Sequence, residues 1–134
     1  MAPQKEITKG RPTNYSGWHR VPNLPRDCFL IDGDWFEMRE RDGQLVPVAC
    51  FETLEVGALF IHNAQSEYPL WDAKVALYTY LKSKLGIPVF IVRHTPDCKL
   101  FSVARLTESG GETEAKVLSE DEYKDLLVHI DQCV

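Results

Sequence analysis

This sequence has little of what marks a membrane-spanning or exported protein. No apolar run approaches the roughly 18 residues that a membrane-spanning helix needs. The first thirteen residues are polar and lack the apolar stretch of a secretory signal. We therefore expect a cytoplasmic protein.

Several common site motifs are also absent. The four cysteines form no C-x-x-C pair, and no His-x-x-x-His accompanies them, which argues against a structural zinc site. There is no G-x-S-x-G nucleophile elbow, no Walker loop and no dinucleotide-binding glycine loop. The sequence therefore does not support a serine hydrolase, a P-loop nucleotidase or a dinucleotide-dependent enzyme.

What the sequence does contain is typical of one small globular domain. Its 134 residues are 44% hydrophobic and 26% charged, and no segment repeats. We expect a flexible N-terminal arm over residues 1–13 and a single domain over residues 14–134. This length is enough to bury a hydrophobic core without disulfides.

Charge is distributed unevenly along the chain. The net charge is −5, yet residues 1–26 carry five basic side chains against Glu6 alone, and the residues from Leu106 onward are strongly acidic. An acidic total argues against binding nucleic acid through bulk charge. The basic N-terminal segment, which contains Tyr15 and Trp18, could still contact a phosphate backbone; alternatively it only solubilises the chain.

The order of sequence patterns predicts a mixed sheet flanked by helices. Asp42-Gly43 is typical of a hairpin turn, Gly86 and Pro88 end a helical pattern, and Ser119 with Glu122 forms a capping box. Residues 55–69 form either a strand or a buried loop. The expected elements are strands over 28–40 and 45–54, a helix over 70–85, strands over 88–94 and 99–106, and a helix after Ser119. This is an α/β domain.

The predicted hairpin brings two acids together. A three-residue turn of Asp42, Gly43 and Gln44 places Asp34 directly opposite Glu52. Each acid then shares its face with apolar neighbours: Phe36 and Met38 on one strand, and Val48, Cys50 and Leu54 on the other. Two opposed carboxylates on an apolar surface favour a divalent cation between them. The alternative is that the strands fray and both acids are solvated at the edge.

The stretch FLIDGDWFEMRERDGQLVPVACFETLE resembles the catalytic hairpin of the PD-(D/E)xK nuclease superfamily. Asp34 matches the first acid, Val48-Ala49-Cys50-Phe51 the apolar run, and Glu52 the second acid. The helix after the hairpin and the strand IPVFIVRH follow in the family's order. The resemblance covers about residues 27–105.

The resemblance implies a restriction-endonuclease-like fold, similar to that of archaeal Holliday-junction resolvases, and metal-dependent hydrolysis of DNA phosphodiester bonds. It implies that Asp34, Glu52 and the backbone carbonyl of Thr53 hold magnesium or manganese. The implied activity is that of an endonuclease, and DNA is the implied partner. A homodimer or a larger nucleic-acid-processing assembly is compatible with it.

One position departs from the family's pattern. Leu54 stands where the family has a lysine that orients the attacking water. On the predicted helix, Lys74 falls inside the apolar stripe that contains Leu77 and Leu81. Some members of the superfamily carry the working lysine on this helix. We therefore expect Lys74 to lean toward the two acids; the alternative is that it extends its amine to water.

Two readings of function follow from these residues. In the first, Asp34, Glu52 and Lys74 are catalytic, and Trp18, Arg20 and Tyr78 contact nucleic acid; Tyr78 is included because some family members have Tyr four residues after Gln here. In the second, the domain has the same fold but is catalytically inactive and binds nucleic acid or a protein partner. Leu54 favours the second reading and Lys74 the first. A third possibility is a small α/β protein whose acids are incidental.

Overall fold

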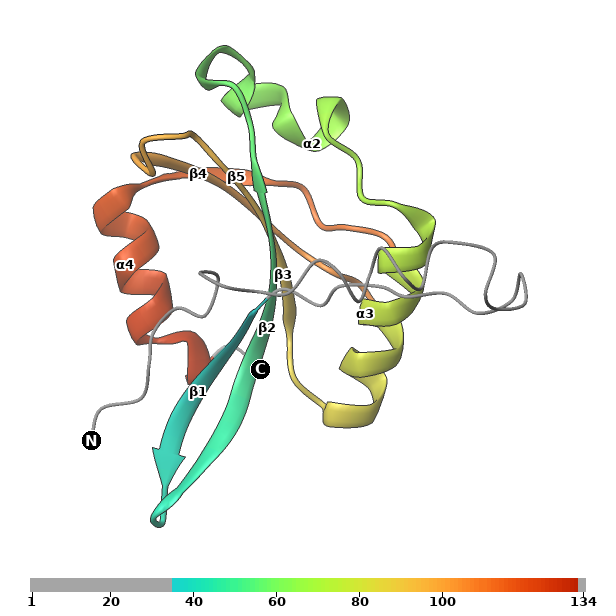
Figure 1. The fold of residues 1–134 in the computed structure, drawn as a ribbon, viewed down its shortest axis with the longest axis vertical. Coiled ribbons are helices and arrows are strands. Elements are labelled where there is room, and N and C mark those ends of the chain that lie inside the picture. Colours follow the sequence, from blue (N-terminus) through green and yellow to red (C-terminus); the bar gives the residue numbers. More distant parts are fainter. Residues whose placement is uncertain (1–34, 133–134) are drawn as a thin grey trace, which may run out of the picture. The chain divides into compact units, whose positions relative to one another are not determined.

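The computed structural model describes residues 35–132, which form a sheet with helices on both faces (Figure 1). The strands of this part are β1 (Trp35–Arg41), β2 (Gln44–Glu55), β3 (Val89–His94), β4 (Leu100–Arg105) and β5 (Lys116–Ser119). Its α-helices are α2 (Ala64–Glu67), α3 (Asp72–Leu85) and α4 (Glu120–Val128). Two 3-10 helices complete it, η1 (Ala58–Asn63) and η2 (Ile130–Gln132).

The five strands lie in the sheet in chain order, β1-β2-β3-β4-β5. β2 and β3 are parallel, and the other neighbours are antiparallel. The connection between the parallel strands runs through η1, α2 and α3, because parallel neighbours need a crossover. The predicted α/β class is confirmed for the described residues. None of the helices in this part is long and apolar enough to cross a membrane.

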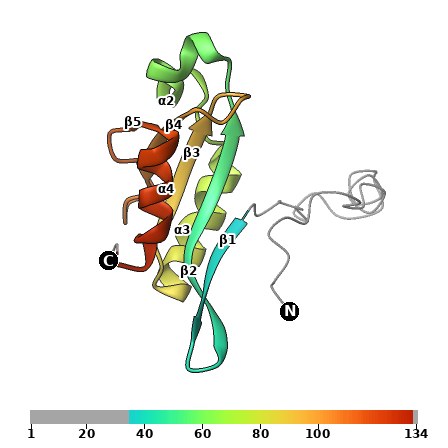
Figure 2. The same ribbon diagram turned by 90° about the vertical axis from the view of Figure 1, so that its left-hand side faces the viewer.

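The core is divided by the sheet. α3 lies on one face and α4 on the other (Figures 1 and 2). The cluster on the α3 side contains Cys50, Tyr78 and Ile91, and the cluster on the α4 side contains Phe51 and Phe90. Successive strand residues point to opposite faces, so this division also assigns each side chain of β2 and β3 to one helix.

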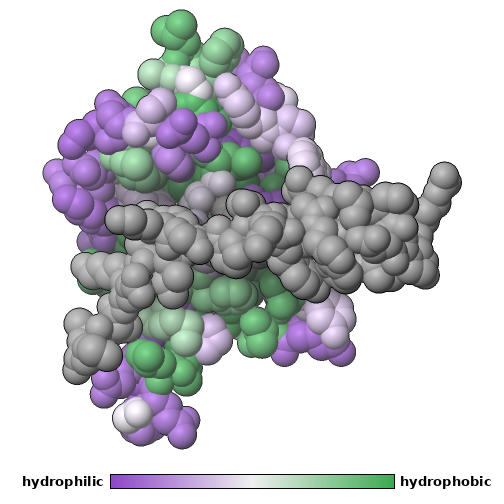
Figure 3. Space-filling view, viewed as in Figure 1, coloured by the Kyte–Doolittle hydropathy of each residue, from purple (hydrophilic) through white to green (hydrophobic). Residues whose placement is uncertain are grey.

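The β1–β2 hairpin turns more tightly than the sequence predicts. Arg41 pairs with Gln44, so the loop has two residues, and the predicted three-residue turn is wrong. Asp42 and Gly43 both adopt positive φ, 51° and 80°, as a turn whose twist matches the strands requires. Hydrophobic surface lies beside the hydrophilic tip of the hairpin (Figure 3).

A β-bulge corrects the register further along the hairpin. Met38 pairs with Pro47 but Glu37 pairs with Ala49, so Val48 is an extra residue on β2. Beyond the bulge, the pairs from Glu37 back to Trp35 follow the register predicted from the sequence. The bulge also moves Val48 into the cluster on the α4 side, which corrects the prediction that it shares a face with Cys50.

Within the described residues, the other boundaries follow the predictions closely, with two differences; the predicted start of the first strand at residue 28 and the predicted arm over residues 1–13 lie outside these residues. α3 ends at Leu85 with Gly86 at φ 65°, and Ser119 and Glu122 exchange both bonds of a capping box. Residues 55–69 are mostly η1 and α2 rather than a strand or a loop, because Val56, Ile61 and Ala64 bury themselves in a small cluster of their own. The short strand β5 was not predicted.

Candidate functional site

Glu52 lies in the interior of the domain. It sits on β2, next to Ile91 of β3, and it is 2% exposed. Its neighbours in the same alternation, Cys50 and Leu54, pack in the cluster on the α3 side, so Glu52 faces α3. A carboxylate in such surroundings is costly unless its oxygens are paired with donors.

Helix α3 supplies those donors. Lys74 Nζ lies 2.8 Å from Glu52 Oε1, and the Tyr78 hydroxyl donates a hydrogen bond to Glu52 Oε2. Residues four apart on a helix share a face, so one helix surface serves both carboxylate oxygens. Together, Glu52, Lys74 and Tyr78 form what we call the α3 triad.

The structure thus brings Lys74 to one of the two acids toward which the sequence predicted that it leans. The Lys74 side chain is 19% exposed, against 2% for Glu52. Its amine is therefore tied to the carboxylate rather than extended freely into water. Leu54, where the pattern that the hairpin resembles has a lysine, packs against the same cluster.

Tyr78 has a different role from the one predicted. Its side chain is fully buried, which leaves no surface for a nucleic acid. Its hydroxyl holds Glu52 instead. We therefore correct its assignment from nucleic-acid contact to orientation of the buried carboxylate.

The remaining predicted site residues are only partly covered by the structure. The Thr53 hydroxyl accepts a hydrogen bond of 3.1 Å from the Trp35 indole, and its neighbour Phe51 belongs to the cluster on the α4 side. The Thr53 side chain therefore points away from the α3 triad, and only its backbone carbonyl remains a candidate ligand. Asp34, Trp18 and Arg20 lie outside the described residues.

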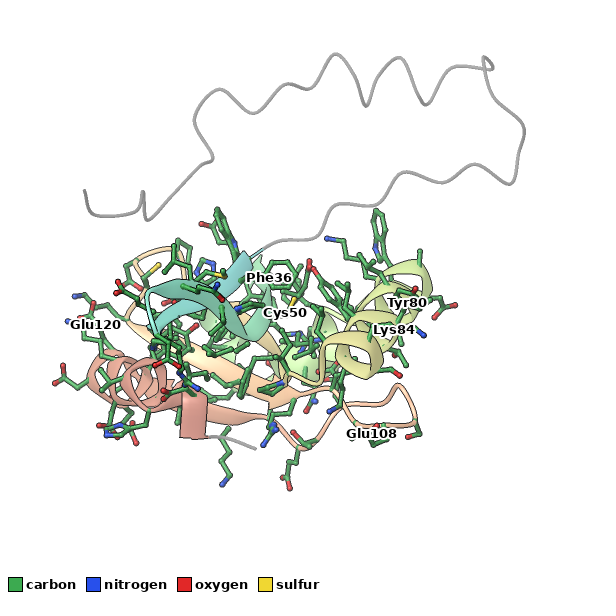
Figure 4. The ribbon with its side chains drawn as sticks, turned by 90° about the horizontal axis from the view of Figure 1, so that it is seen from below. Phe36, Cys50, Tyr80, Lys84, Glu108 and Glu120 are labelled. Atoms are coloured by element: carbon green, nitrogen blue, oxygen red, sulfur yellow. The ribbon has the colours of Figure 1, made fainter. Side chains whose placement is uncertain are left out.

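The outer surface of α3 differs from its inner surface. Figure 4 shows Cys50 at the sheet, and Tyr80 and Lys84 on α3. Tyr80 is 61% exposed, and the Lys84 amine lies 5.7 Å from the centre of its ring. Lys84 thus covers an exposed aromatic ring, and it is a natural comparison for Lys74, which lies nearly three turns earlier on the same helix.

A second buried charge pair was missed in the sequence. Arg93 on β3 is fully buried and lies beside Leu54 in register. Its guanidinium bonds both oxygens of Glu112 at 2.8 and 3.0 Å, and its Nε donates to the Tyr68 carbonyl at 2.8 Å. An arginine inside the apolar run VFIVRH was the available signal. The pair joins β3 to the segment after α2 and to the β4–β5 connection.

Within residues 35–132, no group of three or more His, Cys, Asp or Glu side chains is placed to hold a metal ion. Glu52 Oε1 accepts one hydrogen bond from Lys74 and Oε2 accepts one from Tyr78, and each oxygen retains a second lone pair. Carboxylate and carbonyl oxygens are the ligands that magnesium prefers. The donor chemistry of Glu52 and Thr53 therefore fits this ion, provided that a second acid joins them.

Comparison of the chain with protein-family models, with curated proteins and with solved structures gave no match in any of the three.

Proposed function

We propose that this protein is a metal-dependent nuclease with a restriction-endonuclease-like fold, which hydrolyses phosphodiester bonds in DNA. The observation that carries the proposal is the contact of 2.8 Å between Lys74 and the buried Glu52. It supplies an ammonium group from α3 at an acid whose own strand carries Leu54 in place of lysine. The resemblance of the hairpin to the PD-(D/E)xK pattern supports the same reading.

Asp34, Glu52 and the Thr53 carbonyl would hold the magnesium or manganese ion. Trp35 with Phe51 is the last described pair of the hairpin. Asp34 immediately precedes Trp35 in the sequence. Continuing this register by one residue would place Asp34 opposite Glu52. When bound, the metal would polarise a phosphoryl oxygen and lower the pKa of a water molecule.

The residues of the α3 triad would then have separate tasks. Lys74 orients the attacking water and offsets the negative charge that develops on the phosphorus oxygens. Tyr78 keeps the Glu52 carboxylate in one orientation, since its hydroxyl is buried and bonded to Oε2. Trp18 and Arg20 would contact the DNA.

The alternative function is a catalytically inactive domain of the same fold that binds nucleic acid or a protein partner. Two observations favour it: Leu54 is apolar, and both Glu52 oxygens already have donors. In this case Lys74 neutralises the charge of Glu52, Tyr78 donates a hydrogen bond to it, and the site binds no metal.

The test is cleavage of single-stranded, duplex and branched DNA by the full chain in magnesium or manganese. We expect cleavage by the wild type, and a loss of roughly 100- to 1,000-fold in Lys74→Met, the size associated with removing one preorganised charge-stabilising group. The matched control is Lys84→Met on the outer surface of α3, which should cleave like the wild type.

Metal binding provides a separate measurement. Manganese should raise the melting temperature of the wild type, and Asp34→Asn should abolish that rise. A wild-type chain that cleaves none of the substrates and gains no stability from manganese contradicts the proposal and favours the inactive domain. Cleavage that survives Lys74→Met unchanged contradicts the role of Lys74.

A further inference from the structure

Strand β1 is an outermost strand of the sheet that the described residues form. It pairs with β2 on one side, and no strand between residues 35 and 132 pairs with its other side. An outer strand presents backbone donors and acceptors that can pair with another chain. Proteins usually protect such an edge with proline, lysine or other charged side chains. β1, WFEMRER, contains no proline or lysine, and its four charged residues are two glutamates and two arginines, whose opposite signs can pair across two copies.

One face of this hairpin exposes apolar side chains. Phe36 is 42% exposed, Met38 40% and Leu45 54%. Phe36 and Met38 are two apart on β1, and Leu45 pairs with Glu40, which is two residues further, so all three lie on the same face. Figure 4 shows Phe36 at the hairpin, on the side of the sheet where Cys50 lies.

The sequence of β1 is complementary to itself when it is read in the opposite direction. In an antiparallel pairing centred on Met38, Glu37 of each copy lies opposite Arg39 of the other. Opposite charges directly across two strands stabilise the pairing. Within one copy, Arg39 and Glu37 already form an ion pair of 2.8 Å. A two-fold axis would therefore set two such pairs side by side with alternating charge.

The same pairing joins the apolar side chains. Met38 of one copy meets Met38 of the other on the axis, and Phe36 lies diagonally across from Met38 of the other copy, within reach of long side chains. The exposed apolar face of one hairpin then continues into that of the next, and its polar face does the same. A shift of the pairing by one residue would set the apolar face of one hairpin beside the polar face of the other. A shift by two residues would place Glu37 opposite Glu37 or Arg39 opposite Arg39, so faces and charges together select this register.

We propose that the protein forms a homodimer in which β1 pairs antiparallel with β1 of a second copy, centred on Met38. The two sheets then become one continuous sheet of ten strands, twice the five of one chain. An interface of this kind is isologous, since each copy contributes the same strand. The proposal does not depend on the proposed nuclease activity.

The experiment measures the mass of the full chain in solution by sedimentation. We expect twice the mass of one chain, and a concentration-dependent return to a single chain on dilution. Glu37→Arg and Arg39→Glu each place like charges opposite each other, so each variant alone should dissociate at concentrations at least tenfold higher than the wild type. An equimolar mixture of the two variants restores opposite charges at every pair and should restore the dimer.

A second pair of variants keeps the test independent of the charged residues. Met38→Lys places two ammonium groups on the two-fold axis and should give single chains, while far-ultraviolet circular dichroism stays unchanged. Leu59→Lys, at a 93% exposed position of η1, is the matched control and should leave the dimer intact. A wild type of single-chain mass at all concentrations up to millimolar overturns the proposal, and so does a dimer that survives Met38→Lys.

Discussion

The α3 triad allows a quantitative test of how the buried acid is stabilised. Replacing Lys74 by methionine keeps the length of the side chain but removes the ammonium group that bonds Glu52 at 2.8 Å. The 2% exposed carboxylate then keeps the Tyr78 hydroxyl as a donor but has little access to water. Removing one partner of a buried ion pair costs about 3–5 kcal/mol. Because the Lys74 side chain is 19% exposed, we expect the lower end, about 3 kcal/mol.

Replacing the other partner of the ion pair, Glu52, should lower the free energy of unfolding by less. Glu52→Gln keeps an oxygen that accepts from Tyr78, and the partly exposed Lys74 amine can turn toward water. The loss is then close to that of one hydrogen bond to a charged group, about 1–2 kcal/mol. The double variant contains no buried charge, so it should be more stable than Lys74→Met alone. This gives a coupling free energy of about 1 kcal/mol or more.

The measurement is urea unfolding of the wild type, the two single variants and the double variant at neutral pH. The dependence of the unfolding free energy on urea concentration should be the same in all four, which checks two-state behaviour. For a domain of this size, a loss of about 3 kcal/mol lowers the melting temperature by on the order of 10 °C or more. If Lys74→Met costs no more than Glu52→Gln, the carboxylate does not depend on the amine. The reasoning about the triad would then be wrong.

Three further predictions concern the rest of the fold. Glu112→Ala leaves the fully buried Arg93 without its ion-pair partner and should cost about 3–5 kcal/mol in urea unfolding, whereas the same change at the exposed Glu114 should stay within about 0.5 kcal/mol. Ser119→Ala removes the α4 cap and should cost about 1 kcal/mol, which a melting curve will show. The backbone N–H of Ser119 lowers the pKa of Glu122, so this carboxylate stabilises the fold at neutral pH, and its contribution should vanish as the pH falls below the usual glutamate range. Unfolding curves of Glu122→Gln and the wild type should therefore converge in acid.

Helix-capping and helix-ending residues explain which elements of the fold could be predicted. Gly86 and Pro88 mark the end of α3, and Ser119 with Glu122 marks the start of α4. A cap involves only a few residues that are close in sequence, so the sequence alone reveals it. The β-bulge has no such signal, since Val48 is one apolar residue among several. The four residues of β5 are too few to show a period, and their pairing with β4 makes them a strand.

The candidate site was predictable where one element carried the signal. A lysine inside the apolar stripe of a helix has to find a partner, and this reasoning led from Lys74 to Glu52. The burial of Tyr78 could not be read in the same way, because an aromatic residue on that stripe fits both surface contact and the core. The pairing of Arg93 with Glu112 joins residues 19 positions apart, on a strand and in a connection, and no local pattern links them.

The hairpin also bears on how this domain tolerates insertions and deletions. The two-residue turn shifts the pairing by one, and the extra Val48 shifts it back, so the two features cancel at Trp35 and Phe51. A homologue with one more residue in the turn and no bulge would keep Phe51 opposite Trp35. A change in the turn length alone, or in the bulge alone, would shift the pairing by one residue beyond the bulge, and the β1 side chains there would face the opposite side of the sheet. Turn length and bulge should therefore vary together during evolution. An insertion near residue 43 should be accompanied by a deletion near residue 48.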